Sequence, residues 1–390
     1  MIETTNSISK RGKRGLVKHS SIILLLNELI LVLYMVFDAL NSTSAGNFES
    51  NRTVVYVFMV LSVLAMAIPL LFSLKKLRPN NIAISLLAFL FVVLFNSLLN
   101  SSLTNWDSII SIGMIAWWFV ASCFFMVFSK NNKNNLLHFS RLVFLLYCVV
   151  IVYGSINIKN NFSVEYSRVG YIYHLLCIFP FLVYLENKRP LRIAWFLLVV
   201  SFAMFSFKRG AIIAIVLMFF IYLLVDNYVC RKKNRIKYIG LLLVLILGFF
   251  VFDYFSNGSL SERFSAESMA DGSGRFDLIE QSFNNIKTRS IIQLFLGLSS
   301  GHETPVSVHN EWVKCLSSYG IVGLLFYLVV LFSIVFNGIK RTKAKSDIAP
   351  YYAMSVVYVL WIIQVSGFLF MYSSIFLIMF IGAEKTINGE

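Results

Sequence analysis

Residues 53–74 read TVVYVFMVLSVLAMAIPLLFSL, an apolar run that contains no charged side chain. The hydrocarbon core of a bilayer is about 30 Å thick, and about 20 residues of helix cross it. The run is therefore long enough to span a membrane. Lys75, Lys76 and Arg78 follow it directly, and basic clusters of this kind mark the cytoplasmic end of a membrane helix.

Comparable apolar stretches recur along the chain between short polar breaks. Hydrophobic residues make up 58% of the 390 residues and charged residues only 14%, whereas about 25% of an ordinary soluble domain is charged. A soluble fold could not bury so much apolar surface, so the sequence predicts an all-α polytopic membrane protein with about 12 transmembrane helices. The predicted spans are Ser20 to Leu40, Thr53 to Leu74, Ile82 to Leu99, Ser108 to Phe128, Leu136 to Ile156, Val169 to Leu185, Leu191 to Phe207, Ala211 to Val225, Ile239 to Phe255, Trp312 to Phe336, Pro350 to Val365 and Phe368 to Ile381. The last two are close enough to form one bent helix.

The distribution of positive charge predicts the orientation. A net charge of +15 would suggest nucleic-acid binding in a soluble protein, but here the cations alternate with the apolar spans. If the amino end lies in the cytoplasm, most of the 34 lysines and arginines fall in cytoplasmic turns, so both termini are predicted to be cytoplasmic and no nucleic-acid partner is expected. The basic start runs into a full-length apolar stretch without a small-residue cleavage site, which predicts a signal anchor.

We predict a single integral membrane domain over residues 1–390, with one long loop on the outer face over residues 256–308. Asp271 to Gly274 form a flexible hinge in this loop. Four apolar residues then recur at helical spacing, which predicts an amphipathic helix that the turn at Gly297 to Gly301 ends: Phe276, Ile279, Phe283 and Ile286. The five cysteines are scattered and form no CxxC pair, so we interpret them as packing residues.

Several outer-face cations are candidates for anion binding. Lys208 and Arg209 share a tight outer turn, and Arg275 begins the amphipathic helix. Arg168 precedes the sixth span. Charged groups near a membrane are costly and often functional, but simpler readings stay open: snorkelling of Lys208 and Arg209 to the headgroups, and a surface ion pair between Arg168 and Glu165.

His309, Asn310 and Glu311 lead directly into the tenth span. His309 stands beside both a helix amino terminus and a carboxylate, a setting in which a histidine can hold an anion and move a proton. The alternative is that the three residues only cap the helix, a role that suits Ser307 or Asn310. A zinc site from His302, Glu303 and His309 matches no recognised ligand spacing, and we predict no metal.

Three cationic spots and one histidine on the outer face suit a lipid that carries a pyrophosphate. Arginine donates paired hydrogen bonds to phosphate and remains charged, and preplaced cations stabilise the charge that develops as pyrophosphate leaves. A sugar hydroxyl that attacks benefits from a base, for which His309, assisted by Glu311, is the candidate. The sequence has no DxD pair, which argues against a metal-dependent nucleotide-sugar transferase.

These residues resemble the O-antigen polymerase and O-antigen ligase superfamily of bacterial envelope proteins, the Wzy and WaaL types. The resemblance covers roughly the second half of the chain and depends on three stretches: Ser206-Phe207-Lys208-Arg209-Gly210, Ser273-Gly274-Arg275, and His309-Asn310-Glu311 followed by Tyr319-Gly320-Ile321-Val322-Gly323-Leu324. It implies about twelve helices, a large periplasmic loop, and metal-free action without a cofactor on undecaprenyl-pyrophosphate-linked glycans in the inner membrane. It also implies that Arg209 and Arg275 bind the donor pyrophosphate and that His309 acts near the acceptor hydroxyl. Lys208 and Arg168 match the family less closely, and the resemblance implies the same pyrophosphate-binding role for them less strongly.

Three functions fit this reading. The first is a repeat-unit polymerase, a lipid-pyrophosphate-dependent glycosyltransferase that moves the growing glycan onto the incoming lipid-linked unit. The second is a ligase that transfers the finished glycan to lipid A core. The third is a flippase for the lipid-linked sugar, although no inverted repeat of the kind common in transporters is evident. The expected partners are the lipid-linked donor and acceptor and membrane lipid; a chain-length regulator stays open as a further partner.

Overall fold

The computed structural model describes residues 21–38, 52–129, 132–157, 170–206, 208–230, 235–255, 257–262, 264–265, 275–299, 310–365 and 374–387. These residues contain helices and turns and no strand. The helices are Ser21–Asp38, α2 (Arg52–Leu71), α3 (Asn81–Leu99), α4 (Trp106–Phe128), α5 (Lys133–Asn157), α7 (Ile172–Leu185), α8 (Arg189–Phe205), α9 (Arg209–Cys230), α10 (Arg235–Phe255), α11 (Ser259–Glu262), α13 (Arg275–Lys287), α14 (Ile291–Leu296), α15 (Glu311–Lys343), α16 (Ala349–Val365) and α17 (Ser374–Ile387), with 3₁₀ turns η1 (Leu74–Lys76) and η2 (Ser102–Thr104).

The protein is an all-α polytopic membrane protein. Seven of the described helices are long and apolar enough to cross a bilayer: Ser21–Asp38, α2, α3, α4, α5, α9 and α15. Shorter apolar helices or helix segments lie at Ile172–Leu185, Ile246–Phe255, Ala349–Val365 and Ser374–Ala383. The count of twelve spans and the cytoplasmic placement of both termini stay predictions.

Every predicted span falls on a helix of the structure, and most ends agree within a few residues because polar residues mark them. Asn80 caps α3 by accepting a hydrogen bond from the Ala83 amide at 2.8 Å, and Asn105 caps α4. One end differs from the prediction: helix α9 continues beyond Val225 to Cys230. The link between α16 and α17, residues 366–373, lies outside the described residues, so the option of one bent helix stays a prediction.

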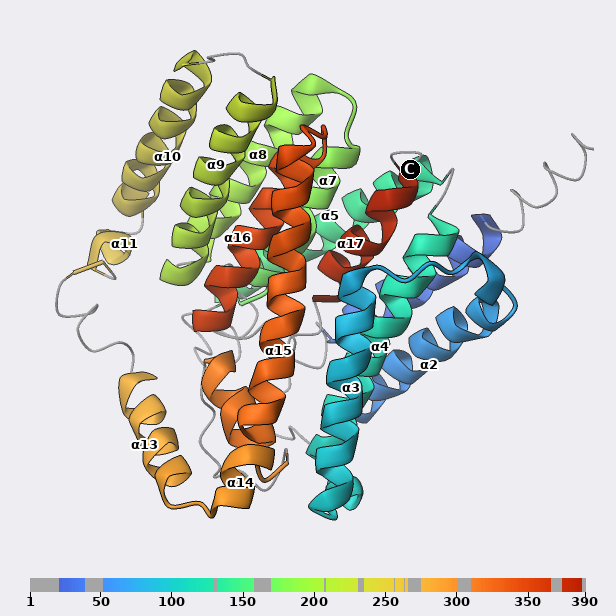
Figure 1. Cartoon of the computed structure of the whole chain (residues 1–390). Helices are drawn as coiled ribbons and strands as arrows, with labels where there is room; N and C mark the ends of the chain where they lie inside the picture. The colour runs from blue at the N-terminus through green and yellow to red at the C-terminus, as the bar shows by residue number, and fades with distance from the viewer. Residues whose placement is uncertain are drawn as a thin grey trace, which may run out of the picture.

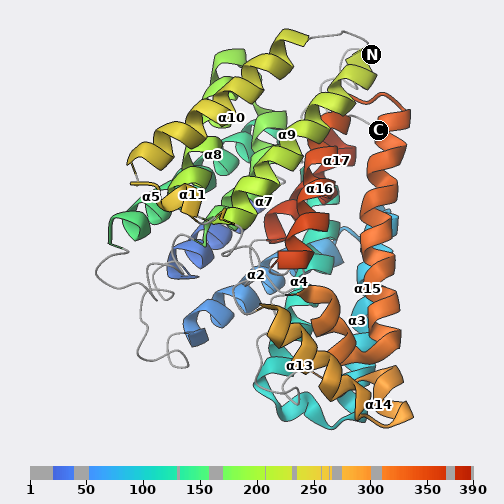
Figure 2. The same cartoon turned by 90° about the vertical axis from the view of Figure 1, so that its left-hand side faces the viewer.

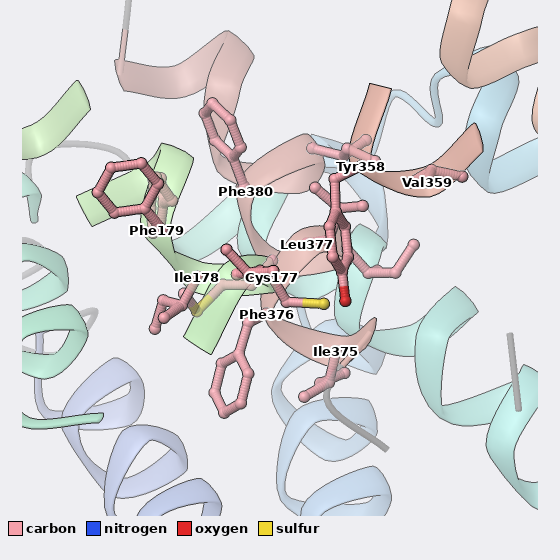
Figure 3. Close-up of a cluster of buried hydrophobic side chains, with 14 of the residues drawn as sticks. Cys177, Ile178, Phe179, Tyr358, Val359, Ile375, Phe376, Leu377 and Phe380 are labelled. Carbon is pink, nitrogen blue, oxygen red and sulfur yellow. The ribbon is translucent and has the colours of Figure 1, made fainter. Parts of the chain in front are cut away.

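The helices form a bundle whose long members run side by side (Figures 1 and 2). The largest contacts join helices far apart in sequence: α9 with α16, α4 with α17, and α3 with α15. Figure 3 shows the buried apolar cluster where α7, α16 and α17 meet, with Cys177, Phe179, Tyr358 and Phe376 among its members. Cys123, Cys148, Cys177 and Cys315 are buried and free of disulfides, as expected of packing residues.

The predicted amphipathic helix is present as α13, but it ends earlier than expected. It stops at Lys287, and a second short helix, α14, fills the space before Gly297. The Ser290 hydroxyl accepts from the Gln293 amide, and the Gln293 side chain accepts from the Ser290 amide in return, so a capping box starts α14. The predicted hinge at Asp271 to Gly274 lies outside the described residues. In Figure 1, α13 and α14 lie together at one end of the bundle.

The expectation of one continuous helix from Trp312 to Phe336 is wrong, because α15 breaks at Gly320. Gly320 has φ 66° and ψ −166°, a conformation that is essentially restricted to glycine. The ring centres of Trp312 and Tyr327 lie 6.2 Å apart, although fifteen residues of straight helix would separate them by about 22 Å. The first segment of α15, residues 311–319, therefore folds back against the second segment, residues 321–343.

Candidate functional site

Lys208 and Arg209 lie at the start of α9. Arg209 is its first residue, and the Lys208 carbonyl accepts from the amides of Ala211 and Ile212 at 2.9 and 3.2 Å. The Lys208 amide in turn donates to the Ser206 hydroxyl at 3.2 Å. Both cations are half-buried. Two positive side chains and the positive end of a helix dipole thus coincide at this turn, an arrangement that favours an anion.

Gly210 fixes the position of this turn against two other helices. The Trp361 indole of α16 donates to the Gly210 carbonyl at 2.7 Å. A Cβ added at Gly210 would lie 2.6 Å from the Tyr173 hydroxyl of α7, so only glycine fits without displacement. The Tyr358 hydroxyl of α16 donates to the Tyr173 carbonyl at 2.7 Å and completes the contact. The backbone next to Arg209 is therefore held by α7 and α16.

Glu311 lies at the first position of α15 and is buried. The preceding Asn310 caps the helix, as predicted, by accepting from the Val313 amide at 3.2 Å. The Glu311 carboxylate interacts electrostatically with Tyr327 in the second segment of α15. Because the bend at Gly320 brings these segments together, Glu311 faces the interior of the folded-back helix.

The fold-back depends on two glycines whose backbones touch. Gly297, with φ 77° and ψ −174°, shares the glycine-only conformation of Gly320. A Cβ at Gly297 would lie 2.5 Å from the Gly320 nitrogen, and a Cβ at Gly320 would lie 2.5 Å from the Gly297 nitrogen. The Arg289 guanidinium donates to the carbonyl and hydroxyl of Ser317 at 2.6 and 3.0 Å, near the end of the first segment. The turn at Gly297 thus packs directly on the break in α15.

A buried cluster of four serines, the serine cluster, joins this turn to the amino-terminal half of the chain; its members are Ser97, Ser102, Ser108 and Ser299. The hydroxyls of Ser97, Ser102 and Ser108 lie 3.1, 2.7 and 3.1 Å from the Ser299 hydroxyl. A hydroxyl offers one donor and two acceptor positions, so these three contacts use the full capacity of Ser299. The Ser299 amide also donates to the Ser318 carbonyl at 2.7 Å. The end of α3, η2 and the start of α4 are therefore tied to α15 through Ser299.

The structure describes only some of the predicted site residues. Arg275 is the first residue of α13, but its side chain, like Arg168 and His309 as a whole, lies outside what is described. The mutual geometry of Arg209, Arg275 and His309 stays a prediction. The described residues contain no group of three His, Cys, Asp or Glu that could hold a metal; His302, Glu303 and His309, on which the zinc alternative rests, are not among them.

Sequence reasoning did not identify Tyr173, Trp361, Gly297 or Ser299 as parts of this region. An aromatic residue in an apolar helix is indistinguishable from packing when its partner is distant in sequence. The local sequence at Gly297 indicates a loop turn, whereas in the structure this glycine allows the close approach of its backbone to Gly320. Only the three-dimensional pairing reveals these roles.

Residues 194–328 match the family model Wzy_C, described as O-antigen ligase. The matched segment runs from α8 into the second segment of α15 and includes Lys208, Arg209, Arg275, His309 and Glu311, whereas Arg168 precedes it. No curated protein sequence matches the chain. The match supports a glycosyltransferase-like membrane enzyme with a polymerase or ligase role in O-antigen biosynthesis. The family match thus confirms the resemblance of this chain to the O-antigen polymerase and ligase superfamily, without distinguishing polymerase from ligase.

Proposed function

We propose that the chain polymerises undecaprenyl-pyrophosphate-linked O-antigen or capsular repeat units at the periplasmic face of the bacterial inner membrane. The observation that carries the proposal is the Lys208–Arg209 pair at the start of α9, inside the matched segment and held in place through Gly210. Two cations beside a helix amino terminus suit a pyrophosphate whose lipid tail stays in the bilayer.

The proposed reaction needs no metal and no cofactor. A hydroxyl of the incoming lipid-linked unit attacks the anomeric carbon of the growing glycan, a new glycosidic bond forms, and the bond from that carbon to the pyrophosphate oxygen breaks. The pyrophosphate leaves on its lipid with the bonding electron pair. Arg209 and Arg275, supported by Lys208 and Arg168, stabilise the charge that develops on it.

His309 accepts the proton of the attacking hydroxyl in this proposal, a role that contributes roughly 10² to 10⁴ in rate. Glu311 supports it from the first turn of α15. Its burial beside Tyr327 fixes the start of the helix next to His309. We therefore assign Glu311 the role of a positioning residue for the proposed base.

A ligase is the second candidate, favoured by the description of the matched family, which names O-antigen ligases. The compact outer segment with its Gly297 turn and the Lys208–Arg209 pair leads us to place polymerase first. A flippase for the lipid-linked unit is the third candidate.

Deletion of the gene separates the three candidates through the surface glycan that remains. Loss of a polymerase leaves lipid A core capped by a single repeat unit. Loss of a ligase leaves bare core and polymer stranded on its lipid carrier, and loss of a flippase strands single units inside the cell. Either of the latter two patterns would overturn the polymerase proposal.

Complementation of the deletion with single variants tests the site. We expect Arg209→Ala, Arg275→Ala and His309→Ala each to abolish polymer while the protein still inserts at wild-type level. Lys340→Ala, which removes an exposed cation in the last turn of α15, is the matched control and is expected to restore full-length glycan. Near-normal polymer in any two of the three site variants would refute the assignment.

A further inference from the structure

An apolar cleft lies between α9, α15 and α16, far along α9 from Arg209. It has a volume of about 360 Å³ and is bordered by apolar side chains from all three helices, among them Ile221, Val225, Ile339 and Val357. Val225 is sixteen residues beyond Arg209 on α9, about 24 Å along the helix axis. The cleft is therefore separate from the candidate site and, in the predicted orientation, lies in the cytoplasmic half of the membrane.

The packing of the three helices explains why a cleft forms here. Helix α16 lies between α9 and α15 and packs along both, whereas α9 and α15 touch each other at few places (Figures 1 and 2). A Cβ added at Gly338 of α15 would lie 3.1 Å from Val356 and 3.2 Å from Tyr352, so α15 approaches α16 closely at this level. Ile339, which borders the cleft, is 47% exposed. Helix α16 thus forms the floor of the cleft, which opens between α9 and α15.

Two lysines and a tyrosine stand at the polar end of the cleft. Lys343, in the last turn of α15, and Tyr228, near the end of α9, both border it. The Lys345 ammonium lies 5.7 Å from the centre of the Tyr228 ring, which places a second cation beside the cleft. All three side chains are exposed, and within the described part of the chain neither lysine forms an ion pair with a carboxylate. The cleft therefore combines apolar walls with a positive rim.

The carboxylates in this region belong to another cavity. Asp226 and Asp347 border a separate polar cavity together with the cations Lys133 and Arg192. Neither carboxylate borders the apolar cleft. An anion at the rim of the cleft would therefore meet two lysines and no carboxylate among the residues that border it.

This combination of surfaces selects the occupant. An apolar cleft of about 360 Å³ on a membrane helix bundle suits an acyl chain, and basic pockets between membrane helices on the cytoplasmic side bind anionic lipid headgroups. A zwitterionic headgroup would add an ammonium, which the two lysines repel. A second copy of the chain, with its net charge of +15, would bring a like basic end to the same level. An anionic phospholipid satisfies both the walls and the rim.

We propose that this cleft binds one phosphatidylglycerol molecule of the cytoplasmic leaflet. Lys343 and Lys345 hold its phosphate, the Tyr228 hydroxyl donates a hydrogen bond to it, and an acyl chain lies over α16 between α9 and α15. Because the lipid fills the space between two helices that touch little, its binding should stabilise the folded protein. The proposal does not depend on the reaction assigned to the outer face.

The purified full-length protein in detergent is titrated with phosphatidylglycerol, phosphatidylethanolamine or phosphatidylcholine of identical acyl chains, and bound lipid is counted by native mass spectrometry. A lysine near an anionic lipid contributes about fivefold in affinity, which corresponds to about 1 kcal/mol. With two lysines we expect one phosphatidylglycerol per chain, bound about 25-fold more tightly than either zwitterionic lipid. We also expect it to raise the unfolding midpoint more than they do. Equal binding of the three lipids would overturn the proposal.

Three variants test where the lipid binds. Lys343→Gln should weaken phosphatidylglycerol about fivefold and leave phosphatidylcholine unchanged. Lys340→Gln removes an exposed cation from the same turn that does not border the cleft, so it is the matched control and should change nothing. Val357→Trp fills the cleft from α16 and should weaken all three lipids alike, because each inserts an acyl chain.

The unfolding midpoint without added lipid verifies that each variant folds, and the two lysine variants alter only exposed side chains. An equal loss of phosphatidylglycerol binding in Lys343→Gln and Lys340→Gln would mean diffuse attraction to the basic end of the protein and would overturn the proposal. Full phosphatidylglycerol binding by folded Val357→Trp would place the lipid outside the cleft and would overturn it too. A dimer that retains no lipid and that Val357→Trp dissociates would assign the cleft to a second copy of the chain instead.

Discussion

Replacement of Gly320 by alanine tests the fold-back of α15. At φ 66° and ψ −166°, a residue with a side chain costs of order 1–3 kcal/mol. The new Cβ would also fall on the Phe295 carbonyl and lie 2.5 Å from the Gly297 nitrogen. These neighbours are backbone atoms at the end of α14 and in the turn after it, so a rotamer change cannot relieve the overlap.

The expected loss of stability follows from these two effects. Overpacking in a well-packed region costs typically 1–3 kcal/mol, which together with the backbone cost gives about 2–6 kcal/mol for Gly320→Ala. A loss of this size would separate the first segment of α15 from the second. Glu311 and Trp312 would then lose their contacts with Tyr327.

The assay is thermal unfolding of the purified protein in detergent, together with the length of the glycan made in complemented cells. Gly240→Ala is the matched control, because an added Cβ at this position in α10 meets nothing within 4 Å, and alanine is up to about 1 kcal/mol better than glycine inside a helix. We expect a lower unfolding midpoint and loss of polymer for Gly320→Ala only. An unfolding midpoint for Gly320→Ala as high as that of Gly240→Ala would refute the fold-back.

Three further substitutions test other contacts. Ser299→Ala removes the hydroxyl that Ser97 and Ser108 contact, at about 0.5–1.5 kcal/mol for each hydrogen bond lost, and is expected to lower the unfolding midpoint and to increase proteolysis after α14. Trp361→Phe removes the hydrogen bond to the Gly210 carbonyl but keeps a ring, so polymer yield is expected to fall up to about tenfold at normal protein level, as the loss of one hydrogen bond allows. Burial raises the pKa of the Glu186 carboxyl, whereas hydrogen bonds from Arg141, the Lys188 amide and Trp195, and the charge of Arg141, lower it. The lowering effects are together larger, so the pKa of Glu186 lies below its ordinary value. Ionised Glu186 therefore adds stability above about pH 4.3, which is lost as pH falls through the lowered pKa; an acid-side decline of the unfolding midpoint that is unchanged in Glu186→Gln would contradict this.

The membrane helices could be predicted because their signal is local. Apolar runs of sufficient length ended at charged or capping residues, as at Lys75 after α2 and Asn80 before α3. The end of α13 before Ser290 can also be predicted from the sequence. Ser290 and Gln293 form a capping-box pattern, which indicates a new helix before Gly297. The apolar spacing alone does not predict α14.

The break in α15 could not be predicted from its own segment. Gly320 and Gly323 both stand in an apolar run, and a glycine inside such a run is common in membrane helices. What distinguishes Gly320 is a backbone contact with Gly297, twenty-three residues earlier in the sequence. The contacts of Gly210 with Tyr173 and Trp361 are likewise non-local, since they join α7, α9 and α16.

The serine cluster gives the amino-terminal half of the chain a structural role that its sequence does not indicate. The family match begins at residue 194, yet Ser97, Ser102 and Ser108 hold the turn that packs on Gly320. Because the bend at Gly320 places Glu311, the end of α3 and the start of α4 contribute to the position of Glu311, the first residue of α15. Substitutions in the serine cluster should therefore affect activity through α15, although the serines themselves need not contact the substrate.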